Sequence, residues 1–173
     1  GVGRHFLDLA AGLSARGVEV VAIYSPGRCD ASFRSRQREI SEVRFVELPM
    51  RRAVHPLDAA DLVRLAKCIG REGPFDVVHC HSSKAGALGR LAARWLKIPS
   101  VYTPHALVTL DPTLSAIKRR FYGGVERWLA RRTAAVIAVS PDEAGHVAAL
   151  GIEAAKVHVV MNGVEPPKFS DRE

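Results

Sequence analysis

Residues 75–90 read FDVVHCHSSKAGALGR, and this stretch decides the fold class. Its first five residues, 75–79, include Phe75, Val77 and Val78, and they predict a strand buried in a parallel sheet. Histidines, serines, a lysine and two glycines follow abruptly, and residues 84–97 then place apolar side chains at helical spacing. The stretch therefore predicts a strand, a polar turn and a helix, the repeating unit of parallel α/β sheets.

The same alternation of apolar runs and amphipathic segments extends along the rest of the chain. Further strands are predicted at 18–24, 43–49, 99–103, 134–140 and 156–163. Further helices are predicted before Gly17, at 56–69, at 113–132 and after Ser140, where the sequence Ser-Pro-Asp-Glu forms a capping box. The expected fold class is α/β, with a doubly wound, mostly parallel sheet that carries helices on both faces.

The composition fits one sizeable domain, because the chain has 173 residues, of which 47% are hydrophobic and 25% charged. No apolar run approaches the roughly 18 residues of a membrane span. Charged side chains at Arg4 and Asp8 argue against a signal peptide. Three cysteines without a CxxC pair favour a reducing compartment over a disulfide framework.

The net charge of +7 favours anionic partners, which are phosphates, nucleic acid or a membrane surface. Nucleic acid is not expected, because aromatic residues make up only 6% of the chain and mostly fall on predicted core faces. The helix predicted at 113–132 carries Arg120, Arg127 and Arg131 beside an apolar stripe. The stripe consists of Ile117, Phe121, Trp128 and Leu129. Such a helix is either an ordinary solvated face or a surface that fits an anionic membrane.

Polar side chains gather where predicted strands end. His79, His81, Ser82 and Ser83 lie at the end of the first of these strands, Thr103 and His105 follow the next, and Ser140 follows a later one. Because ligands bind outside the carboxyl ends of parallel strands, these side chains are expected to line one cleft. His81 is the stronger ligand candidate, whereas His79, nearer the buried strand, is expected to be structural.

Several of these groups have two interpretations. Ser82 or Ser83 caps the following helix, or it binds a phosphate or a sugar hydroxyl together with Lys84. Gly1 and Gly3, just before the first helix, either allow a phosphate to approach closely or form a plain tight turn. His105 is less ambiguous, since Pro104 stiffens its turn, and we expect it to hydrogen-bond a ligand or transfer a proton.

A metal site is considered but not expected. His79 and His81 project to the same side of the strand, and together with His105 they could ligate a metal. However, no carboxylate or cysteine accompanies them at ligand spacing. The sequence also contains no P-loop, GxSxG or HExxH motif, so these three classes of enzyme are not expected.

Four stretches together resemble the amino-terminal domain of glycosyltransferase family 4. They are GVGRHFLDLAAGLSARGVEV (1–20), DVVHCHSSKAGALGRLAARWLKIPSVYTPHAL (76–107), ERWLARRTAAVIAVS (126–140) and KVHVVMNGVE (156–165). The resemblance covers nearly the whole chain in the right order. The segments HCHSSKAG and YTPH are most similar to members that build polysaccharide repeat units on lipid carriers.

The resemblance implies a GT-B enzyme, in which two Rossmann-like domains face each other across a cleft. In such enzymes the amino-terminal domain mainly binds the acceptor, the carboxyl-terminal domain binds the nucleotide sugar, and transfer retains the anomeric configuration, usually without a metal. Gly1 and Gly3 then match the glycine loop near the donor phosphates, and His105 matches the histidine that reaches the donor sugar. His81, Ser82, Ser83 and Lys84 match the segment that lines the cleft.

Further expectations follow from the same resemblance. Asn162 belongs to the turn that leads out of the domain, which gives a domain at 1–164 and the start of an interdomain linker at 165–173. No cofactor is expected, because the nucleotide sugar is a substrate. A first strand and a second domain with an E-x7-E motif are missing relative to the family pattern, so this chain alone is expected to be inactive.

The expected function is the amino-terminal half of a retaining glycosyltransferase that is cytoplasmic or peripheral on the inner face of the cell membrane. Its expected acceptor is a lipid-linked saccharide in cell-surface polysaccharide synthesis. Three alternatives remain at this stage. One is a 2-epimerase-type enzyme of similar fold, which needs acid/base carboxylates at the strand ends. The others are a non-catalytic nucleotide-binding module and a membrane adaptor that uses its basic helix.

Overall fold

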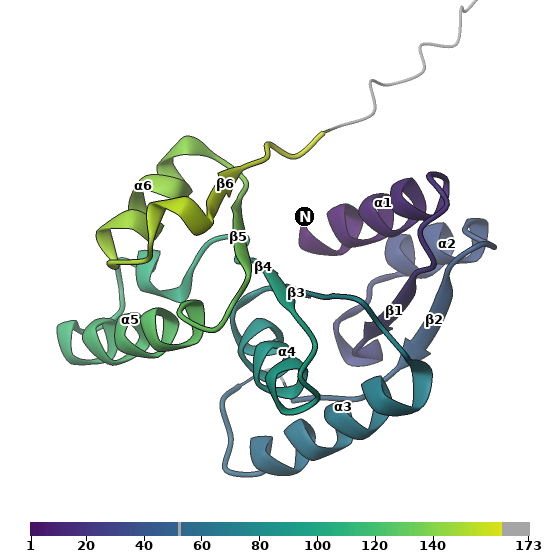
Figure 1. Ribbon diagram of the computed structural model, residues 1–173, viewed down its shortest axis with the longest axis horizontal. Helices are drawn as coiled ribbons and strands as arrows, with labels where there is room; N and C mark the ends of the chain where they lie inside the picture. Colours follow the sequence, from purple (N-terminus) through teal and green to yellow (C-terminus); the bar gives the residue numbers. More distant parts are fainter. Residues whose placement is uncertain (52, 164–173) are drawn as a thin grey trace, which may run out of the picture.

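Short parallel strands alternate with helices along residues 1–51 and 53–163, which are the residues that the computed structural model describes (Figure 1). The α-helices are α1 (Val2–Ser14), α2 (Ala31–Glu39), α3 (Asp58–Glu72), α4 (Ser83–Trp95), α5 (Ala116–Ala130) and α6 (Pro141–Ala149). The strands are β1 (Val21–Tyr24), β2 (Arg44–Glu47), β3 (Val78–His81), β4 (Ser100–Thr103), β5 (Ala135–Ala138) and β6 (Val157–Val159). Three short 3-10 helices complete the order, η1 (Pro26–Arg28), η2 (Val108–Leu110) and η3 (Ala154–Lys156). Val164 and the linker predicted at 165–173 lie outside the described residues.

All strand pairs in the described residues are parallel, which confirms the predicted α/β class. The strands form a four-stranded sheet in the order β3-β4-β5-β6 and a two-stranded sheet, β1-β2. In the larger sheet His81 lies opposite Thr103, so that β3 and β4 end at the same edge. The polar residues that follow these two strands are therefore brought together.

Two local predictions were wrong. The strand predicted at 75–79 is shifted to Val78–His81, because its register is set by pairing with Ser100–Thr103 of β4. The glycine turn predicted at the start of the chain is instead the first turn of α1, and Gly3 lies inside that helix. A Cβ atom on Gly3 would come within 3.1 Å of Phe33 on α2, so this glycine serves the contact between two helices.

Helix α4 packs very closely on one face of β3 and β4, because of the two glycines in the stretch that decides the fold class. A Cβ atom on Gly86 would lie 2.4 Å from the Tyr102 ring, and one on Gly89 would lie 2.7 Å from Sγ of Cys80. Cys80 and Tyr102 belong to the main apolar core. Since side chains alternate along a strand, the neighbours of Cys80, His79 and His81, face the opposite side of the sheet.

A buried ion pair joins α4 to α5 under the sheet. The Arg90 Nη2 atom lies 2.7 Å from Oε2 of Glu126, and the Arg90 guanidinium also stacks 3.7 Å from the centroid of the Tyr102 ring. Both charged side chains are almost fully buried. The pair fixes two helices and the central strand β4 relative to one another.

The two sheets are separated by an apolar cavity of about 320 Å³. Among the described residues, β1 pairs only with β2, and β3 pairs on one side only, with β4. Val21, Ile23, Val78 and Cys80 line the cavity, as does Ile69 from α3. One edge of β1 and one edge of β3 are therefore left without a strand partner in this part of the chain.

None of the helices in the described part of the chain is both long and apolar enough to cross a membrane.

Candidate functional site: a histidine cluster at the sheet edge

Four imidazole rings gather where β3 and β4 end. His79 and His81 lie on the same side of β3, as their spacing predicted, with ring centroids 4.2 Å apart. His105 follows β4, and its Nε2 atom lies 3.1 Å from Nδ1 of His81. The two rings are stacked, at 20° between planes. The predicted convergence of His81 and His105 is therefore confirmed.

The fourth ring, His5, was not among the sequence-based candidates. It comes from the second turn of α1, and its ring centroid lies 4.7 Å from His105 and 5.8 Å from His81. Helix α1 thus covers the face of β3 opposite to α4 at this end of the sheet. The position of His5 depends on how α1 crosses the sheet, which the sequence alone does not show. Its one signal in the sequence was that it lies in a segment that resembles the family.

Burial keeps these histidines in their neutral form. Desolvation, together with repulsion from the neighbouring His5, lowers the pKa of His79 to about 4. Desolvation also lowers the pKa of His81 to about 2 and that of His105 to about 4, with repulsion from the other rings as a second cause. The cluster therefore offers neutral ring nitrogens at physiological pH, as hydrogen-bond donors, acceptors or metal ligands.

The backbone around the cluster is strained. Ser82, His105 and Ala106 all have positive φ angles, of 61°, 53° and 70°. Residues other than glycine seldom adopt this region, and such strain concentrates at functional sites. Ser82 is also the N-cap residue of α4, but the structure gives its side chain no capping hydrogen bond.

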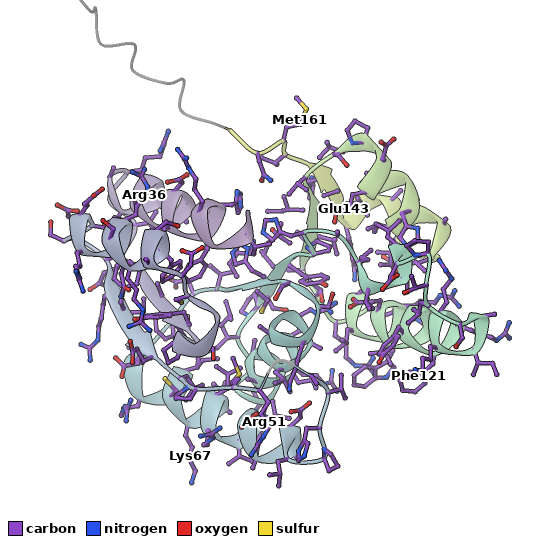
Figure 2. All side chains as sticks on the ribbon, turned by 180° about the vertical axis from the view of Figure 1, so that it is seen from behind. Arg36, Arg51, Lys67, Phe121, Glu143 and Met161 are labelled. Carbon is purple, nitrogen blue, oxygen red and sulfur yellow. The ribbon has the colours of Figure 1, made fainter. Side chains whose placement is uncertain are left out.

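A buried carboxylate holds the strained turn that carries His105. Oε1 of Glu143 accepts a hydrogen bond of 2.7 Å from the Ala106 N–H, and Oε2 accepts one of 2.8 Å from the Val139 N–H. Glu143 lies on α6, and Figure 2 shows it between that helix and the sheet. From the sequence, Glu143 was expected only to cap α6. Its Ser140 partner does cap α6, since Ser140 Oγ accepts a hydrogen bond from the Glu143 N–H.

The other predicted site residues lie around the cluster in different settings. Thr103 is buried and its Oγ1 atom lies 2.8 Å from Nε2 of His79, which makes it a support for that ring. The Lys84 ammonium group pairs with Asp58, at 2.6 Å, and with the Ala53 carbonyl. Lys84 is thus held toward α3, and its contact with a phosphate stays a prediction.

Gly1, Ser83, Ser140 and Asn162 make no hydrogen bond to the histidine rings. Gly1 is the N-cap residue of α1, and its carbonyl accepts hydrogen bonds from the N–H groups of Arg4 and His5. Ser83 is the first residue of α4, and Asn162 lies exposed beyond β6. Their predicted contacts with substrate stay predictions.

Comparison with known proteins shows to which family this chain belongs. The family model for the glycosyl transferase 4-like domain matches residues 1–163. The chain belongs to this family. A related sequence is the UDP-Gal:alpha-D-GlcNAc-diphosphoundecaprenol alpha-1,3-galactosyltransferase of Escherichia coli, which is 34% identical over 115 residues. That match covers 65% of this chain and 29% of the galactosyltransferase.

Solved structures share the fold of this glycosyl transferase 4-like domain. Anabaena Alr3699/HepE in complex with UDP-glucose superposes with a TM-score of 0.69 at 18% identity, covering 95% of this chain and 41% of that one. A UDP-N-acetylglucosamine 2-epimerase described as putative, from Listeria monocytogenes, gives a TM-score of 0.61 at 12% identity, with 90% and 42% covered. The chain thus spans less than half the length of these proteins, and the likeness concerns fold alone.

Proposed function

We propose that this domain forms one wall of the cleft of a retaining glycosyltransferase that moves a sugar from a nucleotide-sugar donor to a lipid-linked saccharide. The observation that carries the proposal is the contact between His81 and His105 at the carboxyl edge of the sheet, in a chain that belongs to the glycosyl transferase 4-like family. The relative from Escherichia coli is named for transfer to a diphosphoundecaprenol-linked sugar, which supports the choice of acceptor.

The proposed roles follow from the chemistry of sugar transfer. Bond breaking develops positive charge on the sugar ring and negative charge on the leaving diphosphate. A neutral imidazole held on a strained, clamped turn orients the sugar without repelling the developing positive charge. We assign this role to His105, and assign acceptor binding to His81 and Ser82.

An epimerase-type function is less well supported, although the fold is shared. Such chemistry needs acid and base carboxylates beside the sugar. The carboxylate nearest to the strained turn, that of Glu143, already accepts two backbone hydrogen bonds. Among the described residues, the groups that surround the strained turn are therefore imidazoles, and a pair of free carboxylates for epimerisation is not found there.

The role of His105 is tested in the full-length enzyme with a UDP-sugar donor and a diphosphate-lipid-linked acceptor. We expect His105→Ala to reduce kcat by about a hundredfold or more, as loss of an oriented polar contact at the reacting centre does. His158→Ala, which removes an exposed histidine on β6, serves as the matched control and should leave kcat unchanged. Wild-type turnover by His105→Ala would refute the assignment.

The acceptor-binding role of this domain is tested on the 173-residue chain itself. Saturation-transfer NMR with a lipid-diphosphate-sugar analogue should show contacts that are lost in His81→Ala. Tight binding of the free nucleotide by this chain alone would instead favour a nucleotide-binding module.

We also propose that the domain works against the anionic inner face of the cell membrane, through α5. Three apolar side chains on one stripe of this helix face solvent, since Ile117, Phe121 and Trp128 are 83%, 64% and 43% exposed. Figure 2 shows Phe121 projecting from α5 away from the body of the molecule. The predicted stripe needs one correction, because its fourth member, Leu129, is buried in the core.

Cationic side chains border this exposed stripe, which suits a surface of anionic lipid headgroups. Lys118 and Arg120 are exposed on α5, and Arg131 is exposed at its C-cap. The Arg132 guanidinium stacks on the Trp128 ring at 4.4 Å. Apolar side chains flanked by cations bind at the boundary between headgroups and acyl chains. A helix that contacted only water would gain nothing from three exposed large apolar groups.

Membrane contact is measured by sedimentation with vesicles of phosphatidylcholine, with and without phosphatidylglycerol. The chain should bind the vesicles that contain phosphatidylglycerol, and the double variant Ile117→Ser, Phe121→Ser should lose this binding. Trp95→Ser on α4 is the matched control, because Trp95 is also exposed but lies on another helix. Equal binding by all three proteins would refute α5 as the contact surface.

A further inference from the structure

The segment at 105–115, which begins with a histidine of the cluster, is fastened to helix α6 at two points. The Glu143 carboxylate accepts a hydrogen bond of 2.7 Å from the Ala106 N–H. Further along the segment, Oγ1 of Thr109 and Nε2 of His146 lie 2.7 Å apart. Thr109 is fully buried, so its polar groups need partners within the protein.

Arg119 on α5 supplies a third fastening. Its Nη1 atom donates a hydrogen bond of 2.8 Å to the carbonyl of Thr109. Its Nη2 atom donates to the carbonyls of Asp111, at 3.0 Å, and of Leu114, at 3.3 Å. One planar guanidinium thus binds three carbonyl groups of a single segment. The fixed fork of N–H groups in arginine suits this arrangement, whereas a lysine ammonium group acts as a point charge.

The contacts of Arg119 lie close to the turn that carries His105. The 3-10 helix η2 begins at Val108, and the Leu110 N–H donates a hydrogen bond of 2.9 Å to the carbonyl of Leu107. Leu107 is only 2% exposed and belongs to the main apolar core. A displacement of this short helix would therefore move Leu107 and the turn directly before it.

The turn needs support from both sides, because His105 and Ala106 have consecutive positive φ angles. Such a conformation persists only where the surrounding contacts determine it. Glu143 binds the turn itself, and Arg119 binds the segment that follows it. We propose that Arg119 is a positioning residue for His105, which keeps the segment at 105–115 in the arrangement that aims the imidazole at the sugar. This inference rests on the proposed role of His105 in sugar transfer.

Another arginine of the same helix provides a matched control. Nε of Arg127 donates a hydrogen bond of 2.6 Å to the carbonyl of Leu150, the C-cap residue of α6. Like Arg119, it fastens α5 to a backbone carbonyl. However, Leu150 lies at the opposite end of α6 from Glu143, which is in the first turn. A loss of the Arg127 contact should therefore leave the His105 turn in place.

The positioning role is measured first in the 173-residue chain, by NMR of the histidine ring signals and without any sugar. Arg119→Met should shift or broaden the ring signals of His105, and Arg119→Lys should shift them less. Arg127→Met should leave them unchanged. If Arg119→Met does not fold, Arg119→Lys is compared with Arg127→Lys in the same way. Unchanged His105 signals in the Arg119 variants, or equal shifts in the Arg127 variants, would overturn the proposal.

The consequence for sugar transfer is measured in the full-length enzyme with a double-mutant cycle. Arg119→Met should lower kcat by about tenfold or more, because the imidazole is misplaced. It should lower kcat no further in the His105→Ala background, since it acts through that ring. An equal loss in both backgrounds would contradict the positioning role. Wild-type turnover by His105→Ala would instead refute the proposed function, while the ring signals would still decide whether Arg119 holds the turn.

Discussion

At the scale of single residues, Glu143 explains how a histidine can be held in an unfavourable backbone conformation. His105 and Ala106 both have positive φ angles. For residues other than glycine, this conformation costs about 1 kcal/mol or more each. The Glu143 carboxylate offsets this cost with two charge-assisted hydrogen bonds to the backbone. It acts on the cleft only through His105, as a positioning residue.

Removal of this clamp should therefore affect both stability and the position of His105. We expect Glu143→Ala to lower the free energy of unfolding by about 3 kcal/mol, because two buried N–H groups lose their acceptor. The ring signals of His105 in NMR spectra should broaden or shift as the turn relaxes. Asp142→Ala, at the exposed neighbouring position, is the control. Unchanged His105 signals in Glu143→Ala would contradict the positioning role.

Single residues also mark the limit of what the sequence predicts. His81 and His105 could be predicted because parallel strands end at one edge, and that rule needs no side-chain detail. His5, Glu143 and Lys84 could not be placed correctly. Their settings depend on how α1, α6 and α3 lie against the sheet, and neither periodicity nor capping rules contain that information.

At the scale of elements, the distance between α4 and the sheet is set by Gly86. Its missing Cβ would lie 2.4 Å from the Tyr102 ring, which is only 1% exposed and held by Arg90. We expect Gly86→Ala to lower the free energy of unfolding by about 1–3 kcal/mol, because α4 must move outward. Urea denaturation measures this change.

Gly124 on α5 gives the matched control for this prediction. Nothing lies within 4 Å of a Cβ atom built there, and the residue is exposed. Gly124→Ala should therefore raise the free energy of unfolding by up to about 1 kcal/mol through helix propensity alone. If both substitutions had the same effect, close packing at Gly86 would not be the reason for its glycine.

The buried pair of Arg90 and Glu126 should be much less tolerant of change than an exposed ion pair. Glu126→Ala leaves the Arg90 guanidinium buried without its counter-ion, and should cost about 3–5 kcal/mol of the free energy of unfolding. The double variant Arg90→Met, Glu126→Leu removes both charges and should recover most of that loss. Thermal unfolding of the three proteins measures the difference, and a double variant less stable than Glu126→Ala would contradict this account.

Most elements were predicted in type and order, but α2 was not among the predicted helices, and several bounds differ. Apolar runs marked every strand, yet β3 begins three residues later than predicted. Phe75 and Val77 favour a strand in the sequence, but Val77 is half exposed and pairing with β4 begins only at Val78. Strand bounds are decided by the neighbouring strand, which a single sequence does not display.

At the scale of the whole molecule, the histidine cluster makes stability depend on pH. The folded pKa of His79 and of His105 is about 4, against 6.5 for an ordinary histidine, and that of His81 is lower still. Between these values the unfolded chain binds more protons than the folded one. The contribution of these neutral histidines to the free energy of unfolding is therefore fully present above pH 6.5, and it is lost as the pH falls toward 4.

The pH dependence is measured by urea denaturation between pH 7.5 and pH 4 in the presence of EDTA. The rings of His79 and His81 lie against each other, and the charges of His5 and His105 also act on His81. The acidic group that acts on His5 is Asp8. His79→Gln keeps a group that can bond Thr103 but removes one titrating ring. Its curve should be shallower by up to about 1.4 kcal/mol per pH unit. Identical slopes for both proteins would rule out His79 as a contributor.

The cavity between β1 and β3 has a consequence for the behaviour of this chain in solution. Both strands present a backbone edge to the same apolar space, and among the described residues neither edge has a partner. Exposed edges of this kind recruit extended segments from other chains. Concentrated samples of these 173 residues should therefore tend toward strand exchange and association, and a short peptide with alternating apolar side chains, added in trans, should suppress it by joining the two sheets into one.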